Sequence, residues 1–294
     1  MEKRLIRIGS RDSKLALAQS RLVMKRIHKA HPELELELVA MKTTGDKILD
    51  KTLDQIGGKG LFVKELDRAL REGEVDLCVH SLKDVPMELP EGLPLVAYSR
   101  RANARDALVL PPGCAALAPG AAIGTASPRR AVQLAALFPK NPVKAVRGNV
   151  LTRLEKLDGG EYGALVLAFA GLSRLHMTGR VSRVFSTDEM IPAAGQGILA
   201  IQGRAGERYG FLTEVDDDFS RRAALAERAF VAALDGGCTA PTAAYAEIWG
   251  GQLKLIGLYL PEGAEHPAVG TLVGDAEQPE RIGIDLAMRL RCQV

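Results

Sequence analysis

The pattern of hydrophobic and polar positions changes period repeatedly along the first 170 residues. Short apolar or alternating runs, typical of strands, are separated by longer runs with helical spacing. The first series has strand-like runs at 4–10, 34–43 and 75–82, and helix-like runs at 13–30 and 61–73. The second has strand-like runs at 121–127, 142–148 and 163–172, and helix-like runs at 128–139 and 149–160. Each series predicts an α/β sheet with crossover helices.

The two series also resemble each other in sequence. The segment RIGSRDSKLALAQ, at 7–19, is similar to AIGTASPRRAVQLA, at 122–135. Each contains a strand ending in Ile-Gly, a small hydroxylated residue, an arginine and then a helix. This internal similarity predicts two α/β domains of similar build with a cleft between them.

The last hundred residues follow a different plan. The run at 196–204 is predicted to be a strand that returns to the first domain. A helix is predicted over 220–237, an antiparallel hairpin turning at Gly250-Gly251 over 243–260, and a final helix over 280–291. These elements predict a small α+β third domain.

Composition is that of an ordinary globular protein, with 294 residues, 47% hydrophobic and 26% charged. No apolar run approaches the roughly 18 residues of a membrane span. The charged start of the chain has no signal-peptide core, so we expect a cytoplasmic protein. A net charge of only +3 and 4% aromatic residues argue against nucleic-acid binding.

Four cysteines are scattered without a C-x-x-C pair, which argues against a disulfide framework and a zinc site. Cys78 falls within a strand-like run and is predicted to be a small core residue. Cys238 follows Gly236 and Gly237 in ALDGGCTAP, where the backbone is open to close approach of a ligand. Spacing alone leaves open whether Cys238 is functional.

Arginines recur where a predicted strand turns into a helix. They are Arg11, Arg129 and Arg130, with Arg147 and Arg153 at a third such place. Helix N-termini present unpaired N–H groups, and guanidinium groups bind carboxylates or phosphates through two hydrogen bonds. For any single arginine a solvated surface charge is an equal interpretation. As a set, the arginines predict an anion-binding cleft, with Lys59 and Arg174 as further candidates.

One carboxylate is predicted at the end of a buried strand. Asp84, in VHSLKDVP, is followed by Val-Pro, which predicts an extended loop where α/β folds place chemistry. A hydrolase triad with His80 and Ser81 is rejected, because alternation puts these two side chains on opposite faces of the strand. A surface pair between Asp84 and Lys83 is the alternative. The histidines show no metal-ligand spacing.

Nine motifs, in order and spacing, resemble the porphobilinogen deaminase (hydroxymethylbilane synthase) family of tetrapyrrole biosynthesis, and they cover nearly the whole chain. They are IRIGSRDSKLAL, TTGD, GGKGLFVKELDRAL, VHSLKDVP, IGTASPRR, VRGNVLTRLEKL, AGLSRL, PAAGQG and ERAFVAALDGGCTAP. The resemblance implies two periplasmic-binding-protein-like (type II) α/β domains plus a small C-terminal α+β domain. Their expected extents are 1–99 with 199–217, 100–198, and 218–294, the last carrying the cysteine loop.

The resemblance also implies a reaction. The enzyme would deaminate four porphobilinogen molecules and join them head to tail on a dipyrromethane cofactor, held to Cys238 by a thioether, and release hydroxymethylbilane. Asp84 would be the catalytic group. The implied cofactor-binding residues are Cys238, Lys83, Thr125, Ser127, Arg129, Arg130, Arg147 and Asn149. The implied substrate-binding residues are Arg11, Ser13, Lys59, Arg153 and Arg174. No metal, nucleic-acid or membrane partner is implied, and we expect a monomer.

A second class of function shares some of these features. A binding module for small anionic ligands would have the same cleft and arginines, but it has no need for Asp84 or Cys238 in these contexts. Consumption of porphobilinogen with release of ammonia distinguishes the enzyme from such a module.

Overall fold

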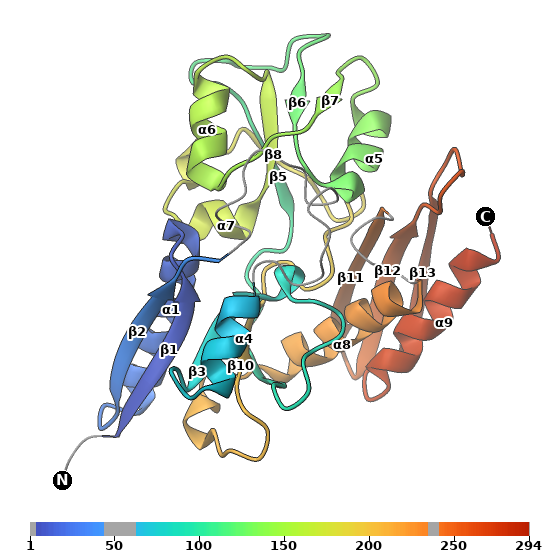
Figure 1. The fold of residues 1–294 in the computed structure, drawn as a ribbon. Helices are drawn as coiled ribbons and strands as arrows, with labels where there is room; N and C mark the ends of the chain where they lie inside the picture. The colour runs from blue at the N-terminus through green and yellow to red at the C-terminus, as the bar shows by residue number, and fades with distance from the viewer. Residues whose placement is uncertain (1–3, 44–62, 235–240, 294) are drawn as a thin grey trace. The chain divides into compact units, whose positions relative to one another are not determined.

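The computed structural model describes residues 4–43, 63–234 and 241–293. The chain divides into two compact units, Met1–Ala102 with Gly197–Arg221, and Asn103–Gln196 with Arg222–Val294 (Figure 1). The first unit contains one five-stranded sheet, and the second contains a five-stranded and a three-stranded sheet. Within the described ranges, no helix is long and apolar enough to cross a membrane.

The sheet of the first unit has the strand order β2-β1-β3-β10-β4. Its strands are β1 (Leu5–Arg11), β2 (Glu35–Met41), β3 (Leu77–Ser81), β4 (Leu95–Tyr98) and β10 (Leu199–Gln202). β1 pairs in parallel with β2 and β3, whereas β10 lies antiparallel between β3 and β4. The predicted strand at 196–204 therefore does return to the first sheet.

Two helices cover opposite faces of this sheet because side chains along a strand alternate. α1 (Lys14–Ala30) packs Val23 and Ile27 against the face that carries Leu77, and α4 (Lys64–Arg71) packs Leu66 against the face that carries Cys78. Cys78 is fully buried, which confirms the predicted core role. Burial, and then the nearby charge of Asp67, raises the pKa of its thiol well above the ordinary value. The described part of this unit also contains two short 3-10 helices, η1 (Leu82–Asp84) and η3 (Gly210–Leu212).

The five-stranded sheet of the second unit has the order β7-β6-β8-β5-β9. Its strands are β5 (Asp106–Val109), β6 (Ile123–Gly124), β7 (Val143–Lys144), β8 (Ala164–Ala168) and β9 (Arg183–Val184). The strand predicted over 142–148 is thus only two residues long. The helices are α5 (Pro128–Leu137), α6 (Val150–Asp158), α7 (Phe169–Arg174) and the 3-10 helix η2 (Thr178–Arg180).

The two five-stranded sheets share one topology, as the internal repeat predicts. In each, the first strand lies between the second and third, and an antiparallel strand separates the third from the fourth. β5 takes in the second sheet the position that β10 takes in the first. This is the type II order of periplasmic binding proteins, so the expected fold class is confirmed.

The repeated Ile-Gly has a packing cause. A Cβ atom at Gly9 would lie 2.8 Å from Cys78 Sγ, and one at Gly124 would lie 2.5 Å from Leu165 Cδ2. In both sheets the first strand passes so close to side chains of the third strand that a methyl group does not fit. Glycine is therefore required at the same point of both copies.

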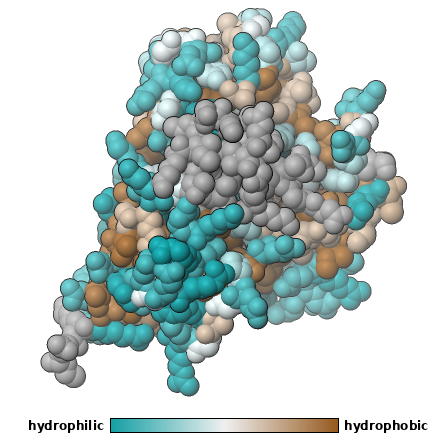
Figure 2. All heavy atoms as spheres, in the orientation of Figure 1, coloured by the Kyte–Doolittle hydropathy of each residue, from teal (hydrophilic) through white to brown (hydrophobic). Residues whose placement is uncertain are grey.

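The three-stranded sheet has the order β11-β12-β13 and is antiparallel. Its elements are α8 (Asp218–Ala233), β11 (Thr242–Trp249), β12 (Gln252–Tyr259), β13 (Ala268–Asp275) and α9 (Pro279–Arg291). Gly250 and Gly251, with φ of +56° and +78°, form the predicted hairpin turn. Phe230 of α8 and Leu286 of α9 pack against Gly257 of the sheet. On the face drawn in Figure 2, hydrophobic residues are interspersed among hydrophilic ones.

Candidate active site

A pocket of the first unit lies at the ends of β1 and β3. The lining residues are Arg11, Ala16, Gln19, Val63, Val79, His80, Ser81 and Asp84. β1 and β3 are parallel neighbours, and ligands of α/β sheets bind at the carboxyl ends of such strands. The pocket thus brings together Arg11 and Asp84, two of the predicted site residues.

The local geometry of both residues differs from the prediction. Arg11 is the last residue of β1 rather than the start of a helix, and α1 begins only at Lys14. The hydroxyl of Ser13 caps α1 by accepting the N–H of Ala16 at 3.3 Å. Asp84 ends a 3-10 turn rather than lying in an extended loop, because the N–H of Val85 donates to the carbonyl of Leu82 at 3.1 Å. The Asp84 side chain is exposed.

His80 and Ser81 point to opposite faces of β3, as predicted. Ser81 is hydrogen-bonded to Gln19 of α1, whereas His80 Nε2 lies 3.0 Å from Gln202 Oε1 on β10. Gln202 Nε2 donates to the carbonyl of Leu93, so its Oε1 faces His80 and the proton of that contact belongs to His80 Nε2.

The imidazole of His80 is neutral at neutral pH. Burial lowers the pKa of His80 from 6.5 to about 4. The hydrogen bond with Gln202 and the charge of Asp84 oppose this shift, and the charge of Arg11 reinforces it. Asp84 therefore has an uncharged imidazole beside it rather than a second cation.

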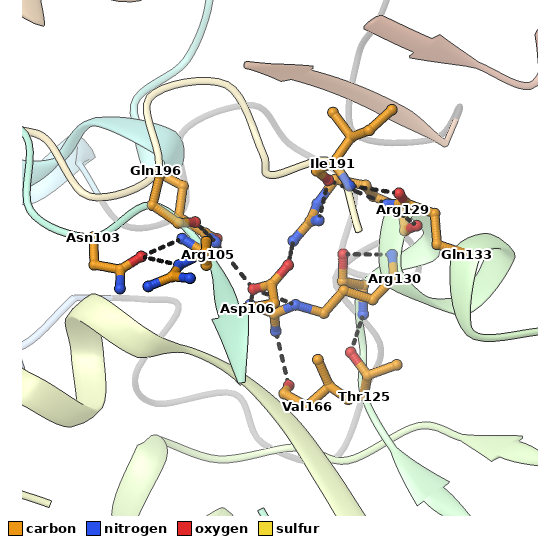
Figure 3. A network of polar contacts seen from close by, with 12 residues as sticks. Asn103, Arg105, Asp106, Thr125, Arg129, Arg130, Gln133, Val166, Ile191 and Gln196 are labelled. Carbon is orange, nitrogen blue, oxygen red and sulfur yellow. Dashed lines mark hydrogen bonds and ion pairs between the residues drawn. The ribbon is translucent and has the colours of Figure 1, made fainter. Parts of the chain in front are cut away.

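The second unit holds the arginine pair Arg129–Arg130, at the start of α5. Both side chains are buried, with 6% and 7% of their surface exposed, and both bind Asp106 at the start of β5 (Figure 3). Arg129 Nη2 lies 2.8 Å from Oδ2 of Asp106, and Arg130 Nη2 lies 2.7 Å from Oδ1. Arg130 Nε and Gln196 Nε2 also donate to Oδ1, at 3.2 and 2.9 Å.

Backbone carbonyls complete the shell around the pair. Arg129 Nη1 donates to the carbonyl of Ile191, and Arg130 Nη1 donates to that of Val166. Burial alone would raise the pKa of Asp106, but the two guanidinium groups outweigh it and hold this pKa well below its usual range. Burial lowers the pKa of Arg129, the charge of Asp106 opposes this, and the charge of Arg130 adds to it.

The cluster of Arg129, Arg130 and Asp106 has a net charge of +1. Two guanidinium groups face a single hydrogen-bonded carboxylate among the described residues. Arg129 Nε is buried and has no hydrogen-bond partner in the part of the chain that the structure describes. A buried donor and an uncompensated charge both favour an anionic ligand. The pair therefore fits a group that carries carboxylates, such as a dipyrromethane.

Most of the other predicted ligand residues of the second unit lie near helix starts. Ser127 caps α5 by accepting the N–H of Arg130, and Thr125 Oγ1 accepts the N–H of Ser127. Each hydroxyl keeps its own hydrogen to donate. Asn149 caps α6 through Oδ1, which leaves its amide N–H groups as donors. Arg153 Nε donates to the carbonyl of Gly148, Arg147 is half-buried, and Arg174 ends α7.

Two predicted residues, Lys59 and Cys238, lie outside the described residues. Lys83 is half-exposed in η1, beside Asp84.

Four polar residues of these sites were not predicted from the sequence. They are Asp106, Gln196, Gln202 and Glu227. Glu227 is fully buried in α8, where its carboxylate accepts the N–H groups of Gly195 and Ala246, both at 2.7 Å. The available signal was a charged or amide side chain at the border of an apolar run, as in RDALVL and LAIQ.

Two sheets of type II order and a buried, net cationic arginine pair define a class of α/β proteins suited to small anionic ligands. A family model described as "Porphobilinogen deaminase, dipyromethane cofactor binding domain" matches residues 6–209, and one described as "Porphobilinogen deaminase, C-terminal domain" matches residues 222–291. The chain belongs to the porphobilinogen deaminase family.

Curated relatives support this assignment over the full length. A porphobilinogen deaminase from Acetivibrio thermocellus is 52% identical over 285 residues, which cover 97% of each chain. One from Thiobacillus denitrificans is 44% identical and covers 97% of this chain and 95% of its own. Among solved structures, the BenM effector binding domain with its effector benzoate is 15% identical, at a TM-score of 0.43, over 73% of this chain and 90% of that chain.

Proposed function

We propose that this protein is a transferase that deaminates porphobilinogen and joins four molecules head to tail into the linear tetrapyrrole hydroxymethylbilane. The observation that carries the proposal is the net cationic Arg129–Arg130 pair in a chain of this family. Porphobilinogen carries an acetate and a propionate, and a chain of such units brings many carboxylates to one protein. Each needs a cationic or hydrogen-bonding partner when it is buried.

Asp84 is the proposed catalytic residue. Loss of ammonia leaves positive charge on the pyrrole ring, and a carboxylate near the ring N–H stabilises that charge as it develops. Asp84 is the carboxylate of the first-unit pocket. The neutral His80 beside it does not compete with the substrate for the negative charge. In this proposal the same carboxylate also passes a proton to or from the ring N–H.

The proposed carboxylate-binding residues fall into two groups. Residues assigned to the substrate are Arg11, Ser13, Lys59, Arg153 and Arg174. Residues assigned to a dipyrromethane cofactor are Lys83, Thr125, Ser127, Arg129, Arg130, Arg147 and Asn149, with Cys238 as the attachment point. Bound through a thioether, that group supplies the pyrrole carbon at which chain growth starts. The side chains named here hold carboxylates and keep the growing chain in place.

The proposal includes the organisation of the protein. The proposed domains are 1–99 with 199–217, 100–198, and 218–294. Separate α/β and C-terminal sheets support this division. We also propose that the protein acts as a cytoplasmic monomer.

Intact mass spectrometry tests the attachment, and substrate consumption tests the reaction. The purified protein is expected to exceed its polypeptide mass by two pyrrole units, and a Cys238→Ser variant is expected to show the bare mass. Only the parent protein, and not the Cys238→Ser variant, should consume porphobilinogen and release ammonia. A Cys114→Ser variant is the matched control, because Cys114 is exposed and unassigned. If the bare mass persists in the parent after incubation with porphobilinogen, without consumption, the protein is an anion-binding module instead.

A further inference from the structure

The carboxylate of Asp106 is the centre of the arginine cluster, although the chemistry assigned above does not use it. It accepts four hydrogen bonds, two from Arg130, one from Arg129 and one from Gln196. Its side chain is completely buried, so it does not reach a ligand directly. Any effect of Asp106 on binding therefore acts through the two guanidinium groups.

Hydrogen-bond geometry fixes how the guanidinium groups are oriented. Arg130 gives two of its N–H groups to a single oxygen of Asp106 and a third to the carbonyl of Val166. Arg129 is held between the other oxygen of Asp106 and the carbonyl of Ile191. Each guanidinium has five N–H groups, so both keep donors that the described residues do not use. These donors lie at fixed positions, because every used donor has a buried acceptor.

Charge then decides which anion the cluster accepts. Without Asp106 the two arginines would carry two positive charges in a buried site, and a dianion would neutralise them. With Asp106 ionised, the cluster carries one, and one carboxylate neutralises it. A dianion would leave one negative charge buried without compensation, which is strongly unfavourable.

We propose that Asp106 is a positioning residue that sets the specificity of the Arg129–Arg130 pair, making it a site for a single carboxylate rather than for a dianion such as sulfate or phosphate. The inference rests on the proposed function, because it explains how a buried arginine pair holds a pyrrole carboxylate without retaining inorganic dianions. Gln196 completes the shell of Asp106 by donating to both Asp106 and the carbonyl of Ala104.

The test uses the full chain with Cys238→Ser, in which the attachment point is absent. Propionate and sulfate are titrated separately at constant ionic strength, and the arginine Nε–H signals of Arg129 and Arg130 are followed by NMR. The signals are assigned with Arg129→Gln and Arg130→Gln variants. The readout is the ratio of the sulfate to the propionate dissociation constant, which a purely structural role of Asp106 would not change.

In the parent we expect propionate to bind at least as tightly as sulfate. Asp106→Asn should raise the cluster charge by one and lower the sulfate dissociation constant at least about tenfold relative to propionate. The double variant Asp106→Asn/Arg129→Gln restores the original net charge and should return the ratio to that of the parent. The proposal is overturned if folded Asp106→Asn keeps the parental ratio, or if the parent itself prefers sulfate tenfold.

If Asp106→Asn does not fold, a tenfold preference of the parent for sulfate still overturns the proposal. Failure of the proposed function is detected separately, as absence of porphobilinogen consumption by the wild-type protein, whereas the anion ratio is measured without any turnover.

Discussion

His80 gives the protein a stability that depends on pH, and replacing it with glutamine should remove this dependence. In the folded protein the pKa of His80 is about 4, because the imidazole is buried on the same face of β3 as Cys78, with Gln202 of β10 as its hydrogen-bond partner. In the unfolded chain it returns to about 6.5. Between these values the unfolded chain binds more protons than the folded one, so the free energy of unfolding falls as the pH is lowered.

The size of the effect follows from the two pKa values. A difference of about 2.5 between the pKa of His80 in the unfolded and folded states corresponds to about 3 kcal/mol in the free energy of unfolding. This contribution is complete above pH 6.5 and is lost progressively as the pH falls to about 4. Among the described residues, Arg11 of β1 and Asp84 of η1 are the charged groups that shift the pKa of His80, and Asp67 of α4 hydrogen-bonds its partner Gln202. Gln202, on β10, contributes a hydrogen bond but no charge.

Urea unfolding at a series of pH values between 4 and 7.5 measures the effect. From pH 7.5 to pH 4, the free energy of unfolding of the wild type should fall by about 3 kcal/mol more than that of His80→Gln. Glutamine can still donate a hydrogen bond to Gln202, but it does not titrate. NMR titration of the imidazole should show a midpoint near 4. Gln202→Glu should raise that midpoint by placing a carboxylate at 3 Å. The reasoning would be refuted if the free energy of unfolding changed equally with pH in the wild type and His80→Gln, or if the imidazole of His80 titrated with a midpoint near 6.5.

Three further predictions concern single residues. Asp84→Asn should lower porphobilinogen consumption at least about 100-fold with an unchanged circular dichroism spectrum, and activity near wild type would remove Asp84 from the reaction. Gly124→Ala should lower stability by about 1–3 kcal/mol in thermal unfolding, because its Cβ would lie 2.5 Å from Leu165 Cδ2; Gly179→Ala, with nothing within 4 Å, is the control. Glu227→Gln places an amide NH₂ group against one of the two N–H donors and should lower the free energy of unfolding by about 1–3 kcal/mol. The amides of Gly195 and Ala246 should then exchange hydrogen faster, and unchanged exchange at both would contradict the prediction.

The architecture was largely predictable because the chain contains the same plan twice. Ile-Gly followed by a hydroxylated residue and a helix marks the first strand of both sheets, and the structure shows the same strand order around it. β13 was missed because its sequence alternation is weak, with four small or hydroxylated residues among its eight positions. The strand predicted over 142–148 was too long, since only Val143 and Lys144 pair with β6.

The candidate site was predictable only in part. Residue type and position at a strand end single out Arg11 and Asp84, and the structure brings both into one pocket. The partner of Arg129 and Arg130 was not predictable, because Asp106 lies 23 and 24 residues away in the sequence and no local sequence pattern indicates that it pairs with these arginines. Pairing of this kind depends on the antiparallel insertion of β5 into the sheet, which is a property of the tertiary fold.

The two units differ in the charge of their candidate sites, and the proposed reaction uses both. In the first, Asp84 lines a pocket whose buried histidine is neutral, which supports the proposal that its carboxylate stabilises positive charge on the substrate. In the second, a buried carboxylate is outnumbered by guanidinium groups, so the cluster attracts a carboxylate. A pyrrole with acidic side chains that becomes cationic when it loses ammonia presents both kinds of charge. Burial keeps the imidazole of His80 neutral against the opposing hydrogen bond of Gln202, and Asp106 reduces the charge of the arginine cluster from two to one.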